Sequence, residues 1–374
     1  MSQFDSLIIG EVAQDTNVDY DGTTVQAVGG AVYYSGFAAA NIGHKTAVLP
    51  KADTTQVDLA AAFAPAPNVT VYPLHSKASF VTKNVYHTPD RERRTSTVDS
   101  VIEPYRPEEV PEIDAAIWHL AGLVGGDIPN EMIPYAAQHA MVAIDVQTML
   151  RWVENGSMVY HDWAEKREML PYVRFLKTDA AEAEILTGLT DRAEAAKLLY
   201  AWGAKEVLIT HNTEVLVYDG QEIYTCPIKA RNLSGRTGRG DTTFAGYINE
   251  RLTSDIPTAL RFATALVSLK METPGPFSGT RRCGGLSERI LLSSAVFHVQ
   301  HPGGRRRNRQ HPPPCIRGAR QGGPRRRHHQ VRSTKGIDIS LTGRYNWQKS
   351  NQGLQGGVQF PTGGTAREPK GMTW

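Results

Sequence analysis

The strongest signal in this chain of 374 residues is the stretch Gly235-Arg236-Thr237-Gly238-Arg239-Gly240-Asp241-Thr242-Thr243-Phe244-Ala245-Gly246. Its glycine-rich half reads as a turn, and the residues that follow predict a helix from about Asp241 to Leu252. Main-chain N–H groups at the start of a helix bind anions, and glycines let a phosphate approach the backbone closely. The stretch therefore predicts a phosphate-binding loop.

Asp241, at the predicted start of this helix, has two interpretations. It can cap the helix, because an aspartate side chain accepts hydrogen bonds from the first N–H groups. It can also act as a base that receives the proton of a hydroxyl attacking a phosphate. The glycine spacing is not GxGxxG, and no GxxxxGK[ST] occurs in the sequence, so neither a dinucleotide-binding nor a P-loop motif is present.

Short apolar strands and helical stretches alternate through residues 1–280. Strands are predicted at 6–10, 46–50, 115–118, 141–145, 173–177 and 207–210, and helices at 36–42, 180–186 and 193–202. Such alternation is typical of an α/β fold with a mostly parallel central sheet covered by helices on both faces. Ligands of such sheets bind at the carboxyl ends of the strands.

Two stretches break the alternation. Residues 15–35 and about 70–100 are rich in Thr, Val and Tyr, a composition typical of antiparallel hairpins. We expect either a small β-lid or an ordinary extension of the sheet edge.

Several blocks, in order along the chain, resemble the PfkB/ribokinase family of carbohydrate and nucleoside kinases. The stretch at 235–246 is similar to the family signature D-T-x-G-A-G-D-x-F, and Gly29-Gly30-Ala31 followed by a helix ending at Ile42-Gly43 is similar to its N-terminal di-glycine block. Residues 177–188 resemble the N-x-x-E block with its L-T-G ending, and residues 208–212 resemble the nucleotide-binding strand and loop. The resemblance implies a ribokinase-like three-layer α/β/α domain over residues 1–280.

The resemblance also implies roles at the catalytic loop. Asp241 would be the catalytic base, and the main-chain amides of Gly238, Arg239 and Gly240 would form the anion hole. Glu182, with Asp179, would hold Mg²⁺, mainly through water, because magnesium on ATP phosphates keeps several water ligands.

For the acceptor, the resemblance implies that Asp15 binds substrate hydroxyls and that Gly29 and Gly30 let the backbone pass close to the substrate. A turn role for Asp15 and a hinge role for the glycines remain alternatives. Asp145 and Arg151 follow a strand at its ligand-binding end, so we expect them to touch sugar or phosphate, with a surface role for Arg151 as the alternative.

For the nucleotide, the resemblance implies contacts from Thr210, His211 and Asn212 and from Pro274 and Gly275. A structural role for His211 remains open. The chain departs from the family signature at three positions of the loop: Gly235 replaces Asp, Arg236 replaces Thr and Arg239 replaces Ala. It also departs at one position of the metal block. Asp179 replaces the Asn of N-x-x-E.

The C-terminal residues 281–374 have a different composition. They contain 15 Arg, three Lys and three acidic residues, whereas residues 1–280 carry 23 basic and 35 acidic residues. This low-complexity segment is predicted to be disordered, because it has too little apolar surface to offset the entropy of ordering. Three origins are open: a frameshift near Arg281, since a shifted frame can encode an amphipathic helix; a native tail; or a basic arm for nucleic acid.

Location and partners follow from simpler features. Cys226, Cys283 and Cys315 have no metal-binding spacing, no run of 18 apolar residues occurs, and the first residues lack a basic signal region. We predict a reducing, cytoplasmic protein with no membrane and no nucleic-acid partner, and with a homodimer left open.

The function predicted from these features is an ATP- and Mg²⁺-dependent kinase that phosphorylates a hydroxyl of a small sugar or polyol. A nucleoside kinase is the first alternative: aromatic side chains in the acceptor pocket would favour a nucleoside, and clustered Asp and Asn would favour a sugar. The second is a non-catalytic binding protein whose basic tail contacts RNA.

Overall fold

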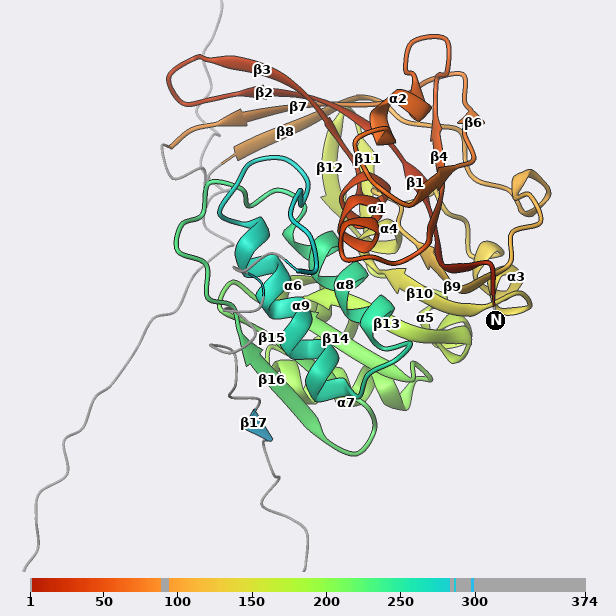
Figure 1. Ribbon diagram of the computed structural model, residues 1–374, viewed down its shortest axis with the longest axis vertical. Coiled ribbons are helices and arrows are strands. Elements are labelled where there is room, and N and C mark those ends of the chain that lie inside the picture. Colours follow the sequence, from red (N-terminus) through yellow and green to blue (C-terminus); the bar gives the residue numbers. More distant parts are fainter. Residues whose placement is uncertain (1, 89–93, 283–285, 287–296, 299–374) are drawn as a thin grey trace, which may run out of the picture. The chain divides into compact units, whose positions relative to one another are not determined.

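The computed structural model describes residues 2–88, 94–282, 286 and 297–298. They form one large sheet covered by helices and one small sheet beside it (Figure 1). The three hypotheses about the C-terminal segment fall on residues 281–374, which lie outside the described residues except for 281, 282, 286, 297 and 298.

The large sheet is parallel from β5 to β14 and antiparallel beyond β14. In spatial order its strands are β17 (Phe297–His298), β16 (Ile223–Pro227), β15 (Glu214–Tyr218), β14 (Glu206–Thr210), β13 (Val173–Asp179), β10 (Met141–Asp145), β9 (Ala115–Leu120), β1 (Phe4–Glu11), β4 (Thr46–Ala52) and β5 (Val69–Val71), with β6 (Leu74–His75) also paired to β4.

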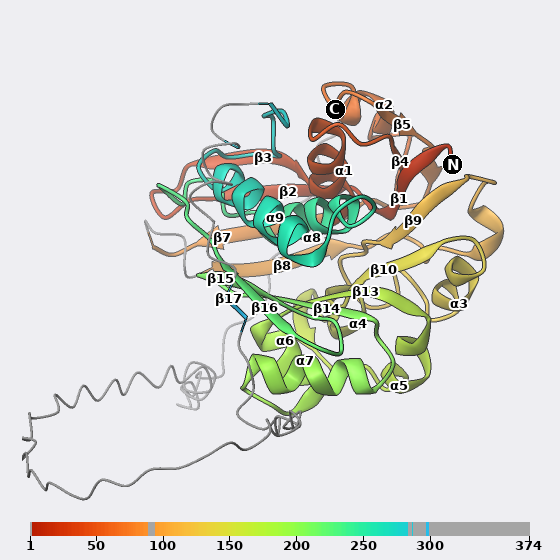
Figure 2. The same ribbon diagram turned by 60° about the horizontal axis from the view of Figure 1, so that its bottom comes forward.

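Helices cover both faces of this sheet (Figure 2). One face packs against α1 (Ala31–Asn41), α8 (Arg239–Glu250) and α9 (Ile256–Lys270), and the other against α3 (Met132–Ala137), α6 (Ala180–Thr187) and α7 (Arg192–Ala201). Strand residues alternate between the two cores as the pleat requires: Leu7 and Ile9 join the core under α3, α6 and α7, and Ile8 joins the core under α1. Shorter helices occur at α2 (Leu59–Phe63), α4 (Gln147–Leu150), α5 (Lys166–Met169), η1 (Pro107–Glu109) and η2 (Leu170–Tyr172).

The fold-class prediction is confirmed: the chain is a three-layer α/β/α protein with a mostly parallel central sheet. The predicted strands and helices all exist, and most bounds differ by one to three residues. The first helix is the exception, because α1 begins at Ala31 and not at Gly36. Tyr33 and Tyr34 resemble strand residues in sequence, but Tyr34 and Phe37 are buried among helix neighbours.

The small sheet contains the stretches predicted to form a lid, and we call it the lid; its strand order is β11-β12-β8-β7-β2-β3. The bounds are β2 (Ala13–Val18), β3 (Thr24–Gly29), β7 (Phe80–Tyr86), β8 (Arg94–Ser100), β11 (Arg151–Glu154) and β12 (Ser157–Tyr160). The predicted lid stretches were too wide, since residues 31–35 belong to α1 and β5 and β6 pair with β4 of the large sheet. The hairpin β11–β12 was not predicted.

The glycine-rich stretch does lead into a helix, but α8 starts at Arg239, two residues before the predicted start. Gly238 is the N-cap, with φ of 75°, a left-handed conformation that favours glycine. Asp241 is therefore the third residue of the helix, and the interpretation of its side chain as the N-cap is wrong.

Among the residues that the structure describes, no helix has both the length and the apolar character needed to cross a bilayer.

Candidate active site

A buried ion pair marks the carboxyl ends of two central strands. Asp145 ends β10 and faces Lys177 of β13 in register. The Lys177 ammonium lies 2.7 Å from Asp145 Oδ2 and 3.9 Å from Glu182 Oε2, and all three side chains are buried. The end of the sheet thus gathers acidic groups around one cation.

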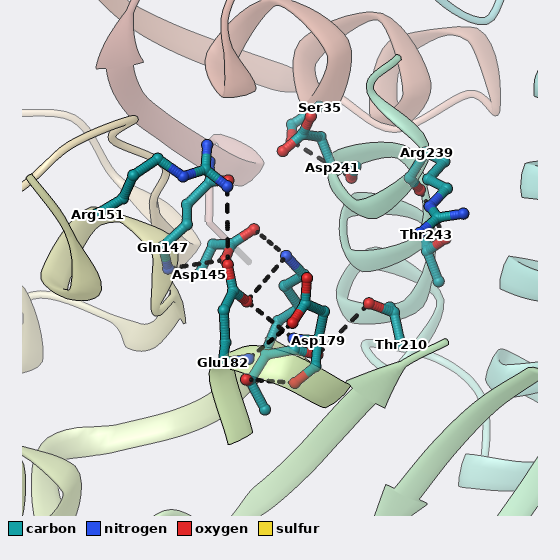
Figure 3. Close-up of polar contacts among 12 residues, drawn as sticks. Ser35, Asp145, Gln147, Arg151, Asp179, Glu182, Thr210, Arg239, Asp241 and Thr243 are labelled. Atoms are coloured by element: carbon teal, nitrogen blue, oxygen red, sulfur yellow. Dashed lines mark hydrogen bonds and ion pairs between the residues drawn. The ribbon is translucent and has the colours of Figure 1, made fainter. Parts of the chain in front are cut away.

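Asp179 and Glu182 hold each other at the start of α6. The Glu182 N–H donates to Asp179 Oδ1 and the Asp179 N–H donates to Glu182 Oε2, both at 2.8 Å, which is a capping box. The Glu182 Oε1 atom faces the guanidinium of Arg151 at 3.8 Å. Glu182 therefore points from α6 toward β11 and the ion pair, with one carboxylate oxygen in the cap (Figure 3).

Burial and neighbouring charges shift the pKa values of these groups. Burial raises the pKa of Glu182 to about 7, with Asp179 and Asp145 adding to the rise and Lys177 and Arg151 opposing it. Burial alone would lower the pKa of Lys177, but the carboxylates of Asp145, Glu182 and Asp179 outweigh it and raise this pKa. Lys177 therefore stays charged at neutral pH.

Asp241 projects from the first turn of α8, close to Ser35 of α1, whose hydroxyl donates to the Asp241 carbonyl at 3.4 Å (Figure 3). Burial, followed by the negative charge of Asp145, raises the pKa of Asp241 to about 6. A carboxyl group with such a pKa is ionised at neutral pH and is a stronger base than an ordinary aspartate.

The main-chain N–H groups of the loop differ in whether they already donate a hydrogen bond within the protein. The Arg239 N–H donates to the Arg236 carbonyl at 3.2 Å, so it is engaged in a turn. Within the described part of the chain, the N–H groups of Gly238, Gly240 and Asp241 donate to no other group. A Cβ at Gly240 would lie 3.3 Å from Lys177 Nζ, so the helix start and the buried cation face the same space.

A polar cavity of about 140 Å³ lies between the lid and the start of α8. Its lining joins three residues predicted to bind or react with the acceptor, namely Asp15, Arg151 and Asp241, and also Gly30. The other polar lining residues are Asn17, Thr82, Asn84, Gln147 and Thr237, and the aromatic ones are Tyr34, Phe80 and Tyr86.

The di-glycine step shapes the wall of this cavity. The Thr82 hydroxyl donates to Asp15 Oδ1 at 2.6 Å, and a Cβ at Gly29 would lie 2.4 Å from Asp15 Oδ2. Gly30 has φ of 105°, and a Cβ there would lie 2.3 Å from the Glu11 carbonyl oxygen. A close backbone approach requires glycine at position 30, whereas at position 29 the close neighbour is the Asp15 side chain. Asp15 lies in strand β2, so the turn interpretation of Asp15 is wrong.

A second cavity, of about 300 Å³, adjoins the first and shares Asp15, Asn17, Tyr34, Tyr86 and Thr237 with it. Pro274 and Gly275, predicted to contact the nucleotide, line this cavity together with Lys270 and strands of the lid. Their role in nucleotide binding stays a prediction.

Lys270, the last residue of α9, holds the glycine-rich loop. Its buried ammonium donates to the Gly235 carbonyl at 2.6 Å and to the Thr237 carbonyl, and it lies 5.2 Å from the centre of the Tyr34 ring. A Cβ at Gly238 would lie 2.2 Å from that ring, so Tyr34 packs directly on the N-cap of α8.

The remaining nucleotide candidates follow β14. Thr210 ends that strand, and its hydroxyl donates to the Thr178 carbonyl at 3.5 Å. The His211 N–H donates to the Glu214 carbonyl at 2.9 Å, and burial, with the positive charges of Arg192 and Arg239, lowers the pKa of His211. His211 and Asn212 thus lie in the β14–β15 turn, with Arg239 near enough to act on the imidazole.

Three important residues had no predicted role: Lys177, Lys270 and Tyr34. Lys177 could have been found, since a lysine at the end of an apolar strand needs an acidic partner. Lys270 and Tyr34 lie on helices that are distant in sequence from the loop they hold, and the sequence carries no signal for that contact.

Residues 7–281 match the model of the pfkB family carbohydrate kinase. The chain is 25% identical over 255 residues to a cytidine kinase from Thermococcus kodakarensis, a match that covers 65% of this chain and 87% of that protein.

Solved structures give a similar result. A pyrophosphate-dependent kinase of the ribokinase family in a sulfate complex is 32% identical, with a TM-score of 0.68 over 77% of this chain and 99% of that chain. A pyrophosphate-dependent kinase of that family, complexed with a pyrophosphate analogue and myo-inositol, is 31% identical, with a TM-score of 0.67 over 76% and 99%. Arabidopsis thaliana ribokinase with ribose and ATP is 17% identical, with a TM-score of 0.62 over 78% and 99%, and shares the fold.

Proposed function

The chain belongs to the pfkB family of carbohydrate kinases and is a phosphotransferase with an alcohol group as acceptor, and we propose that it phosphorylates a hydroxyl of a small sugar or polyol, with ATP as donor. The observation that carries this proposal is the carboxylate of Asp241 at the wall of a polar cavity of about 140 Å³, beside the start of α8, where the N-cap Gly238 has no side chain to bond the first N–H groups.

The lining of that cavity supports a polyol. Asp15, Asn17, Asn84 and Gln147 are side chains suited to hydroxyl groups, because each offers a hydrogen-bond acceptor and the amides also offer donors. A nucleoside is the second candidate acceptor, favoured by the aromatic rings of the same cavity and by the similarity to a cytidine kinase. The similarity to a kinase solved with myo-inositol favours the polyol.

The chemistry follows from the position of each group. Asp241 accepts the proton of the attacking hydroxyl, and its pKa of about 6 makes it ionised yet basic at neutral pH. The N–H groups of Gly238 and Gly240, with the helix dipole, stabilise negative charge on the phosphoryl group as it moves. Lys177, held beside Gly240, adds a fixed positive charge on the same side.

The residues fit a magnesium ion in their chemistry. Glu182 and Asp179 offer carboxylate oxygens, which magnesium prefers, and one or two carboxylates with water and phosphate oxygens are its usual ligands. Within the described residues no group of three or more His, Cys, Asp or Glu side chains is arranged to hold a metal, so these two acids would act through water. When bound, the ion would supply neutralisation of the donor phosphates.

Inorganic pyrophosphate is a second candidate donor. The relatives at 31% and 32% identity are pyrophosphate-dependent kinases. The loop of this chain also carries Arg236 and Arg239, where the family signature has Thr and Ala, and Arg239 lies near His211 on the side expected for the donor. Added positive charge suits a compact polyanion that has no nucleoside to contribute binding energy.

The decisive assay mixes the full chain with Mg²⁺, a panel of inositols, sugars and nucleosides, and either ATP or pyrophosphate, and follows the phosphorylated product. Polyol phosphate as the main product supports the proposal, and phosphorylation of nucleosides alone would replace it with the second acceptor. The control is Asp241→Asn, which should slow product formation with every pair by about 10²–10⁴.

A further inference from the structure

The glycine-rich loop is held from behind by one buried cation. Lys270 is the last residue of α9 and is 2% exposed. Its ammonium donates to the carbonyl oxygens of Gly235 and Thr237. The loop is tied at a third point, because the Gly235 N–H donates to the Met271 carbonyl at 2.7 Å. A Cβ at Gly235 would lie 1.9 Å from the Thr273 carbonyl oxygen, so loop and helix end are in direct backbone contact.

The direction of the Thr237 carbonyl matters for the reaction. The described peptide bonds are trans, and in a trans peptide the C=O and the next N–H point in opposite directions. With the Thr237 carbonyl turned toward Lys270, the N–H of Gly238 points away from Lys270. The ammonium thus fixes the orientation of the amide that is the first proposed donor to the phosphoryl group.

Tyr34 closes the arrangement from α1. Its ring lies against Gly238 on one side and 5.2 Å from the Lys270 ammonium, an arrangement in which a cation is attracted to the ring face. Without a cation, the buried carbonyl of Gly235 would have no donor and the part-buried carbonyl of Thr237 would lose its own, so the loop would turn to satisfy them.

We propose that Lys270 is a positioning residue for phosphoryl transfer, which acts by holding the peptides of the glycine-rich loop with their carbonyls turned inward and their N–H groups turned toward the transferring phosphoryl group. The inference rests on the proposed function, since it gives these N–H groups a substrate. Lys270 itself does not touch the reacting atoms.

The charged state of Lys270 offers a readout. Burial lowers its pKa to about 8, and the negative charge of Asp241 on α8 opposes that shift. The other titratable groups that face it are Tyr34 on α1, whose pKa burial raises, and Asp15, Asp19 and Tyr86 of the lid, which line the same cavity. Activity should fall above pH 8 as the ammonium loses its proton.

The loss of activity at high pH should not be a loss of folding. The folded pKa of Lys270 lies below its ordinary value of 10.5, so the unfolded chain binds the proton more tightly and this group adds stability as pH rises from about 8 to 10.5. A falling rate with a constant or rising melting temperature is the signature expected of a positioning role.

The test compares Lys270→Met with Lys51→Met. Lys51 is a matched control, because it is also buried and donates to a backbone carbonyl, that of Pro104 at 2.9 Å, but it lies outside both cavities. We expect kcat of Lys270→Met to fall by about 10²–10³, as when one anion-hole donor is lost, with the acceptor KM changed less than about threefold. Lys51→Met should lower the melting temperature and leave kcat unchanged.

Lys270→Arg covers the case in which the methionine variant does not fold. Arginine stays charged at high pH, so the loss of activity above pH 8 should disappear in this variant. An unchanged kcat in folded Lys270→Met, or the same alkaline loss in Lys270→Arg, would overturn the proposal. Absence of turnover in the wild-type chain with every donor and acceptor would instead refute the proposed function, so the two failures are distinguishable.

Discussion

The ammonium of Lys177 lies 2.7 Å from the carboxylate of Asp145, across the strand pair β10 and β13, with both side chains buried. The pair lies beside the start of α8, because a Cβ at Gly240 would be 3.3 Å from the same ammonium. The charge of Asp145 also raises the pKa of the proposed base, Asp241. A change in this ion pair should therefore alter both the free energy of unfolding and the pKa of Asp241.

Asp145→Asn should move the acidic limb of the pH–rate profile. The negative charge of Asp145 raises the pKa of Asp241, and the positive charge of Lys177 lowers it. The variant removes the first charge and leaves the second unbalanced by it, so the midpoint of the acidic limb should move below pH 6. The variant should also lose about 3–5 kcal/mol of unfolding free energy, because the buried Lys177 loses its nearest carboxylate and keeps only Glu182, at 3.9 Å. Chemical denaturation and kcat against pH are the measurements.

The double variant Asp145→Asn with Lys177→Met is the matched control for that experiment. It removes the unpaired charge and should recover part of the lost stability. If the single variant keeps its acidic midpoint at about pH 6, Asp145 does not act on the base.

Asp241→Asn should lower kcat by about 10²–10⁴, the usual contribution of a general base. It should also stabilise the fold at pH 8. The folded pKa of about 6 lies above the ordinary 3.8, so the stability that this group contributes is present below pH 3.8 and is lost as pH rises through about 6.

A neutral side chain at position 241 avoids that loss, and we expect the melting temperature at pH 8 to rise by about 2–4 °C. Thermal melts at pH 8 and pH 4 check the sign, because the difference should shrink in acid. A variant with near-normal kcat would rule out the proton-acceptor role.

Gly29→Ala should weaken binding of the acceptor. The new methyl group would lie 2.4 Å from Asp15 Oδ2 and displace that carboxylate from the cavity wall. We expect the acceptor KM to rise about tenfold, or about 1.4 kcal/mol, with a smaller change in kcat. Thr24→Ala, at an exposed position of the same strand β3 and outside both cavities, is the control.

Thr82→Val gives an independent check on Asp15. It removes the 2.6 Å hydrogen bond that orients the carboxylate and changes the shape of the side chain very little. A rise in KM for the acceptor with both variants would locate the acceptor at Asp15, and a rise in neither would place it elsewhere.

Arg239→Ala separates the two candidate donors. If pyrophosphate is the donor, loss of this charge should raise its KM about tenfold, since a charge-assisted hydrogen bond is worth about 1.5–3 kcal/mol. The KM for ATP should change less, because the nucleoside supplies further contacts. The control is Arg167→Ala. The guanidinium of Arg167 lies over the ring of Trp202, far from the loop in sequence.

Local signals predicted much of the fold. The apolar runs at 6–10 and Met141–Asp145 become buried parallel strands, and the family resemblance, now confirmed, implied the three-layer α/β/α arrangement. The lid was harder to predict, because hairpin residues such as Arg151–Glu154 have no apolar stripe and are held by pairing with distant strands. Strand pairing of that kind depends on tertiary context more than on local propensity.

The structure brings several of the predicted site residues together, and their roles stay predictions. Asp15, Gly30, Arg151 and Asp241 meet at one cavity, as expected from strand ends and the glycine block. The start of α8 was misplaced because aspartate is a common cap, whereas here Gly238 takes the left-handed conformation and Tyr34 packs on it. Contacts from α1 and α9 decide that geometry, and neither helix carries a sequence signal for it.

The cation behind the glycine-rich loop is part of the chain itself. A dissolved sodium or potassium ion in such a place would come and go with its concentration, but the ammonium of Lys270 is always present at one per molecule. Dialysis, chelators or a change of salt cannot remove it, so these two carbonyls need no ion from the medium as their partner. Only the loss of its proton can remove this charge.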